Sequence, residues 1–253
     1  MEGKCLSVVL PNLSSENISV SGSTSLHHVE HINGRLAPYP EVCGLVVMTT
    51  CGNDIIHNYG WTPPSEGAMY NATLAQAESW IENFETRLNG MLDKIIELFP
   101  GGREVYLADI YDPTDGVGDA LSFMLQHWED GLAIHAGFNK VFEKVTAERD
   151  NVFPVPPHAE FLGHRVHCAQ FWREHYHSDD PTYWFYTDVE DPNDHGYDVI
   201  RRALLNAITS STQLRHLEEL PVNLDVWQGS DNSSRLFCFE RSSAADILLR
   251  SRK

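Results

Sequence analysis

Apolar residues form two patterns along the 253-residue chain. Short runs rich in β-branched residues are typical of buried strands, and they occur at 18–21, 43–50, 105–110 and 152–155. Longer stretches repeat apolar residues close to every 3.6 positions and predict helices at 25–36 (broken at 33–34), 73–98, 132–148 and 196–210. Strands that alternate with helices indicate an α/β protein in which helices cover both faces of a parallel sheet.

The strand at 43–50 ends in the short polar stretch 51–54, which reads Cys-Gly-Asn-Asp. A buried parallel strand delivers such groups to the carboxyl edge of the sheet, where α/β proteins place their sites. The side-chain amide of Asn53 is suited to donate a hydrogen bond to a developing oxyanion. The alternative is an ordinary turn, because Gly, Asn and Asp are common turn residues.

Composition and charge limit the partners of the chain. It carries 36 acidic and 18 basic residues, and the resulting net charge of −18 disfavours nucleic acid and anionic membrane surfaces. No stretch approaches the roughly 20 apolar residues of a membrane span, and the first residues lack the pattern of a signal peptide. The five cysteines show no paired spacing for zinc or for a disulfide framework. We therefore expect a cytoplasmic protein with reduced thiols.

Three segments, in this order, resemble sequence blocks of the SGNH (GDSL-type) hydrolases. Residues 21–25 are similar to the glycine block, 51–54 to the Gly-x-Asn-Asp block, and 188–197 to the closing segment with its Gly-Tyr before the last helix. The resemblance covers residues 17–209. It implies a three-layer α/β/α fold with a flavodoxin-like parallel sheet over residues 1–210, and the cleavage of esters, including lipids and acetylated sugars. Residues 211–253 lie beyond it and are expected to form a C-terminal extension.

The resemblance also implies an oxyanion hole. Gly22 would supply a backbone N–H and Asn53 its side-chain amide, both from the ends of strands. Rigid donors in such places stabilise a developing oxyanion with little reorganisation. The alternative for Gly22 is a turn with positive φ before a helix, and both interpretations can hold at once.

The nucleophile block of the family is absent. A strand followed by Gly-Asp-Ser should precede residue 18, and no serine among residues 1–17 has that context. In a flavodoxin-like order this strand is the central one, between the strands at 18–21 and 43–50. Residues 4–10 do not replace it, because the connection 11–17 is too short for a parallel crossover. We therefore expect a chain truncated at its N-terminus, with its first strand missing and little or no ester hydrolysis.

The Asp-x-x-His pair of the family is not intact either. Alignment of the closing segment places Asp188 in the aspartate position and Asp191 in the histidine position. A carboxylate is a weaker base than imidazole at pH 7. His195 is the first candidate to replace the missing base, oriented by a neighbouring aspartate. The alternative bases, from a neighbouring loop, are His164 and His167.

Other histidines and aromatic residues have alternative interpretations. His27, His28 and His31 have the spacing of metal ligands on a helix, but they lack an acidic or cysteine partner, so we expect a solvent-facing polar stripe. We expect no metal and no cofactor. The aromatic residues of 158–186 either stack on sugars or pack a long loop onto the sheet.

The sequence supports two alternative hypotheses about function. The first is an SGNH-like hydrolase for acyl or carbohydrate esters that lacks the nucleophile block. Its partner would be a small-molecule ester or an acylated carbohydrate. The second is a non-catalytic relative that binds a carbohydrate or a protein through 158–186. The sequence leaves the oligomeric state open.

Overall fold

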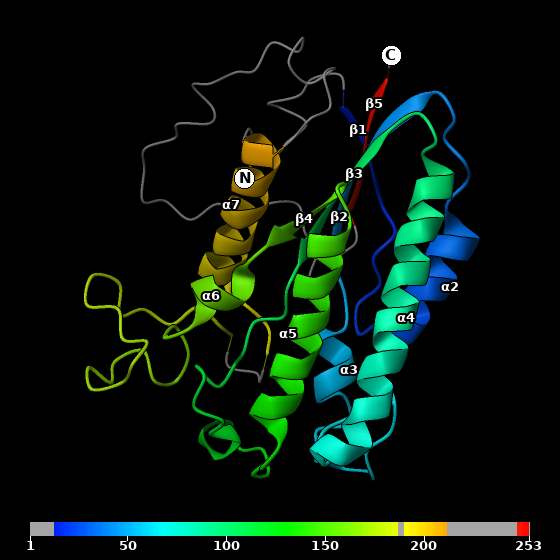
Figure 1. Ribbon diagram of the computed structural model, residues 1–253. Helices are drawn as coiled ribbons and strands as arrows, with labels where there is room; N and C mark the ends of the chain where they lie inside the picture. Colours follow the sequence, from blue (N-terminus) through cyan, green and yellow to red (C-terminus); the bar gives the residue numbers. More distant parts are fainter. Residues whose placement is uncertain (1–12, 187–189, 212–246, 253) are drawn as a thin grey trace.

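The computed structural model describes residues 13–186, 190–211 and 247–252, which contain one five-stranded sheet with helices packed against it (Figure 1). The strands are β1 (Leu13–Asn17), β2 (Val42–Thr49), β3 (Arg103–Ala108), β4 (Val152–Val155) and β5 (Ile247–Arg252). The helices are α2 (Ser25–Arg35), α3 (Gly52–Ile56), α4 (Leu74–Leu98), the 3₁₀ helix η1 (Ala120–Phe123), α5 (Gly131–Glu148), α6 (Pro157–Phe161) and α7 (Asp194–Ser211).

The strands β2, β3 and β4 are parallel neighbours, as the alternating pattern predicted. Val105 of β3 pairs with Val46 of β2 on one side and with Val152 of β4 on the other. Helix α4 connects β2 to β3, and α5 connects β3 to β4, which is the usual way to join parallel strands. The α/β character and the three parallel strands are therefore confirmed.

The prediction of an entirely parallel sheet is wrong, because β5 is antiparallel. β5 lies between β1 and β2, and Leu249 pairs with Ser15 on one side and with Leu45 on the other. This is the position that the predicted strand order assigned to the missing first strand. The preceding segment, 212–246, lies outside the described residues, so the domain boundary at 210 stays a prediction.

The first strand ends earlier than predicted. The apolar run suggested a strand at 18–21, whereas β1 ends at Asn17. The Oδ1 atom of Asn17 accepts hydrogen bonds from the backbone N–H and the hydroxyl of Ser19, at 2.9 and 2.6 Å. Such a side-chain turn replaces the strand geometry, while Ile18 still reaches the core.

Alternate residues of β2 and β3 pack on opposite faces of the sheet. One set joins a core with α2, α4 and α5; it comprises Val46, Met48, Val105 and Leu107. The other set packs against α7 and comprises Leu45, Val47, Tyr106 and Ala108. Burial on both faces explains why β2 is an almost continuous apolar run.

Helix α2 is continuous, so the predicted break at 33–34 is wrong. Its Ile32 is buried in the core beside α4, which stabilises the last turn despite the glycine. Helix α4 begins close to the predicted start, where Thr73 and Gln76 cap it reciprocally. In the part of the chain that the structure describes, no helix combines the length and apolar character needed to cross a bilayer.

Candidate functional site

A cavity of about 180 Å³ opens at the carboxyl edge of β2 and β3. Its wall is formed by the residues that follow these two strands, by the start of α5 and by α7. Most of the wall is apolar and includes Ile55, Ile110, Leu125, Leu132, Ile200 and Leu204. A concave apolar pocket with a few polar groups at this edge is where α/β folds bind ligands. The cavity is therefore the candidate site.

Asn53 borders the cavity from α3. The chain turns from β2 into α3 at Cys51, which adopts the left-handed conformation with φ 77°. The buried amide of Asn53 donates a hydrogen bond from Nδ2 to the backbone carbonyl of Ser23 at 2.8 Å. Gly22 precedes this carbonyl in a turn with φ 74°, and it is not among the described residues that border the cavity. The structure thus brings the segments of Gly22 and Asn53 together.

A buried polar network holds the start of α2 against α3. Asp54 accepts hydrogen bonds from the backbone N–H and the hydroxyl of Ser25, at 2.7 and 2.5 Å. Arg87 of α4 donates to the Ser25 hydroxyl and forms an ion pair with Glu66. Burial raises the pKa of Asp54, while the two bonds from Ser25 and the charge of Arg87 oppose this change. The network fixes the position of α3 and therefore of Asn53.

Asp109 is a polar group that the sequence interpretation missed. It was placed inside the strand at 105–110, but β3 ends at Ala108, so Asp109 stands at the edge and borders the cavity. Its Oδ1 atom accepts a hydrogen bond from the backbone N–H of His158 at 2.7 Å. Burial raises the pKa of Asp109 to about 6; the bond from His158 lowers it and the charge of Glu143 raises it. The sequence did contain a signal for this residue, because Asp109 is a single acidic residue at the end of an apolar strand.

The residue after Asp109 is held by helix α5. The amide of Asn139 exchanges two hydrogen bonds with the backbone of Ile110, both at 2.9 Å, and His135 Nε2 lies 2.8 Å from the same carbonyl. The rings of His135 and His158 are 4.9 Å apart. Burial first, and then His135, lower the pKa of His158 to about 4, so this ring is neutral near pH 7. The cavity edge is therefore rigidly positioned.

Thr50 also borders the cavity, and its hydroxyl oxygen lies 2.7 Å from Nδ1 of His28. His28 is fully buried, so the expectation of a solvent-facing histidine stripe is wrong for this residue. Burial, followed by His31 and His27, lowers its pKa to about 4. So weak a base is poorly suited to activate a hydroxyl group. The pair instead links α2 to the end of β2.

Two of the predicted bases, His164 and His195, stack on Trp184, with ring centroids 3.4 and 5.1 Å from it. Trp184 packs edge-on against Phe161, which stacks on Tyr111. Tyr111 borders the cavity, whereas neither histidine does so among the described residues. An aromatic layer therefore lies between these histidines and the candidate site.

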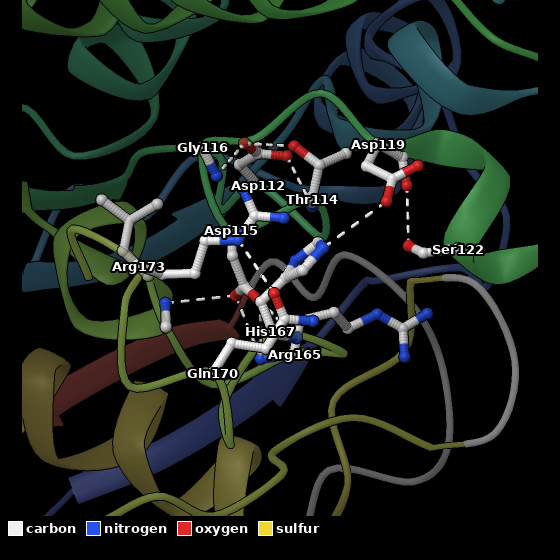
Figure 2. A network of polar contacts seen from close by, with 12 residues as sticks. Asp112, Thr114, Asp115, Gly116, Asp119, Ser122, Arg165, His167, Gln170 and Arg173 are labelled. Atoms are coloured by element: carbon white, nitrogen blue, oxygen red, sulfur yellow. Dashed lines mark hydrogen bonds and ion pairs between the residues drawn. The ribbon is translucent and has the colours of Figure 1, made fainter. Parts of the chain in front are cut away.

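The third predicted base, His167, belongs to a separate polar network (Figure 2). The buried carboxylate of Asp115 accepts hydrogen bonds from the backbone N–H groups of Gly163, Arg165 and His167. The ring of His167 is also buried, and its Nδ1 lies 3.3 Å from Asp115 Oδ2. Asp112 binds its own loop in a similar way, as Figure 2 shows. This network ties the loop after β3 to the loop after α6.

Of the two aspartates in the predicted catalytic pair, the structure describes only Asp191. Asp188 lies outside the described residues. The backbone carbonyl of Asp191 accepts a hydrogen bond from the N–H of Tyr186 at 2.8 Å. The imidazole of His195 lies 3.9 Å from the carboxylate of Asp180, an acid that the sequence interpretation had not paired with it.

The Gly-Tyr pair of the closing segment has a clear structural role. A Cβ atom on Gly196 would lie 2.4 Å from the backbone oxygen of Trp184, so only glycine allows α7 to approach so closely. The next residue, Tyr197, borders the cavity. The pair therefore places the start of α7 against the candidate site.

Threonines and tyrosines supply the hydroxyl groups of the cavity wall. Among the described residues that form the wall there is neither a serine nor a cysteine. Cys51 is adjacent in sequence, but it is fully buried, and burial together with Asp54 raises its thiol pKa well above the ordinary value. A buried thiol of this kind is unreactive.

Comparisons with known proteins bear on the fold. No protein-family model and no curated protein matches the sequence. Among solved structures, the chain is similar to phospholipase A1 from Streptomyces albidoflavus NA297, with a TM-score of 0.51 and 18% sequence identity. The similarity covers 77% of this chain and 79% of that protein. At this level of identity the likeness concerns the fold alone.

Proposed function

We propose that the protein binds the acyl chain of a small ester in the cavity at the carboxyl edge of β2 and β3. The mostly apolar wall of this cavity, with polar side chains that include Asn53 and Asp109, carries the proposal. Each buried methylene of a ligand gains about 0.8 kcal/mol, so a hydrocarbon chain suits this wall. The fold-level likeness to a phospholipase A1 supports an ester as the ligand class.

The finer assignment follows the resemblance to the SGNH hydrolases. Residues 1–210 would form a three-layer α/β/α domain in which the segments of Gly22 and Asn53 adjoin, with the Asn53 amide as the donor toward a polarised ester carbonyl; Gly22 does not border the cavity among the described residues. The hydrogen bond from Asn53 to the carbonyl of Ser23 supports this assignment, because it joins the two segments. The predicted bases His164, His167 and His195 do not border the cavity, whereas His135 does; among the described residues the wall has no serine or cysteine to act as nucleophile. Binding without rapid turnover is therefore the expected behaviour.

Methyl hexanoate binding, measured by isothermal titration calorimetry, tests the proposal. Leu132→Trp should fill the cavity and weaken binding at least tenfold. Leu74→Trp is the matched control: both leucines stand at the start of a helix, with 37% and 36% of their surface exposed, but only Leu132 borders the cavity. Equal affinities in both variants would refute the proposed site. Release of nitrophenolate from p-nitrophenyl hexanoate should stay at the rate of buffer alone.

A second candidate function is carbohydrate binding through the long loop after α6. Phe171 and Trp172 are 73% and 66% exposed, and their rings meet edge to face at 5.1 Å. Exposed rings of this kind can stack on sugars, whereas the buried Trp184 packs the loop. Trp172→Ala should then abolish binding of an acetylated oligosaccharide, and Trp61→Ala, another exposed tryptophan, should not. Binding that survives in both variants would exclude this candidate.

A further inference from the structure

The cavity wall holds one carboxyl group with unused hydrogen-bonding capacity. Asp109 Oδ1 is engaged by the N–H of His158, and within the described part of the chain no residue donates to its Oδ2. The other acids of the wall are engaged differently. Asp112 binds the N–H groups of its own loop, and Glu190 accepts a hydrogen bond from Tyr59. Asp109 is therefore the acid best placed to meet a ligand.

We propose that Asp109 is the polar anchor of the cavity: its protonated carboxyl group donates a hydrogen bond to the carbonyl oxygen of the bound acyl ester. This inference rests on the proposed acyl-binding function and names the group that recognises the ester head. A protonated carboxyl group is a donor, whereas a carboxylate is an acceptor only. A carboxylate would face the carbonyl oxygen with a like partial charge, so ionisation of Asp109 weakens binding.

The surroundings of Asp109 keep it protonated up to a higher pH than an exposed aspartate. Burial is the main cause, and it raises the pKa of this carboxyl group to about 6. From α5, the charge of Glu143 adds to the effect, and from α6 the N–H of His158 opposes it. The His158 ring is neutral above about pH 4 and lies beside His135. The remaining acids bordering the same cavity are Asp112 and Glu190.

The expected pH dependence of ligand binding follows from the raised pKa of Asp109. The protonated fraction of Asp109 is large at about pH 5 and small at about pH 8. Because the ligand binds the protonated form, affinity is highest below about pH 6 and falls as pH rises through that value. One lost hydrogen bond in a dry site corresponds to about tenfold in affinity.

Calorimetric titration with two ligands of similar size tests the inference. Methyl hexanoate carries a carbonyl oxygen, and hexyl chloride does not. The ester should bind wild-type protein about tenfold more weakly at about pH 8 than at about pH 5, while hexyl chloride should bind equally at both. Asp109→Asn keeps a donor at every pH, so its ester affinity should not change with pH. Glu148→Gln, at an exposed acid on α5 that is not among the charges acting on Asp109, should retain the wild-type dependence.

The outcomes separate this inference from the proposed function. If hexyl chloride binds but the ester shows no pH dependence in wild-type protein, the anchor role of Asp109 is wrong and the acyl cavity stands. If Asp109→Asn keeps the wild-type pH dependence, another group is responsible and the inference fails. If neither ligand binds at either pH, both the cavity function and the anchor are wrong. The wild-type comparison needs no variant, so it does not depend on how Asp109→Asn folds.

Discussion

The side-chain amide of Asn53 donates a hydrogen bond to the backbone carbonyl of Ser23 at 2.8 Å, across 30 positions of sequence. Both residues are buried, with 5% and 4% of their surface exposed. The bond joins the turn before α2 to the start of α3, at the edge where the cavity opens. Its geometry therefore contributes both to stability and to the shape of the site.

Asn53→Ala should lower the free energy of unfolding by about 1–3 kcal/mol, because it leaves the Ser23 carbonyl buried without this donor. Urea denaturation followed by circular dichroism measures the change. Asn206→Ala, at an exposed position of α7, is the control and should stay within about 0.5 kcal/mol of wild type. Equal stabilities of the two variants would show that the bond contributes nothing.

Arg87→Met should destabilise the protein by about 2–4 kcal/mol, because the guanidinium lies 3.9 Å from the fully buried carboxyl group of Asp54. Lys144→Met removes an exposed cation that pairs with Glu85 on the surface, so its effect should be much smaller than that of Arg87→Met. Chemical denaturation of both variants gives the comparison. A loss at Lys144 as large as that at Arg87 would contradict the account of the buried network.

Leu249→Pro should destabilise the protein by about 3 kcal/mol or more, because proline has no N–H to donate within a strand paired on both sides. Leu249→Val retains the N–H and should have a much smaller effect. Thermal unfolding monitored by circular dichroism distinguishes the two. A proline variant that melts like the valine variant would mean that β5 does not pair with β2 in solution.

The buried histidine of α2 should make the protein less stable in acid. The pKa of His28 is lowered from 6.5 to about 4 on folding, so the unfolded chain binds the proton more readily between these values. Stability therefore falls as pH drops from about 6.5 to about 4, by up to about 3 kcal/mol. Asp109 acts in the opposite direction, since its pKa is raised to about 6 and protonation there favours the folded state.

Unfolding free energies measured between about pH 4 and pH 7 separate these contributions. His28→Gln should make the decline in stability toward acid less steep, because glutamine does not titrate, while His158, whose pKa is also lowered to about 4, still contributes to it. His127→Gln, at an exposed histidine, should leave the decline as in wild type. An unchanged decline in the His28 variant would show that another group governs acid stability.

Periodicity was sufficient to predict most of the fold. The apolar spacing located α4, α5 and α7 and the strands β2, β3 and β4, because burial on a helix face or on both sides of a strand leaves a regular pattern. It did not predict β5, since strand pairing between distant segments leaves no local signal. It also placed β1 too late, because the side chain of Asn17 ends that strand by a local turn.

The candidate site was predicted only in part. The edge after β2 was located from the polar stretch that contains Asn53, and this residue borders the cavity. Asp109 was missed because the boundary of β3 was set two residues too far along the chain. The burial of His28 was missed because sequence spacing alone does not show which side of α2 meets the sheet. Such features depend on tertiary packing.

A crystal structure of the protein soaked with methyl hexanoate at about pH 5, where Asp109 is largely protonated, tests the central claim most directly. The account predicts density for the acyl chain between Ile110 and Leu204, with the ester carbonyl oxygen within hydrogen-bond distance of Asp109. Density only elsewhere, for example against Trp172, or an empty cavity at saturating ligand, would contradict the assignment of this cavity as an acyl-ester site.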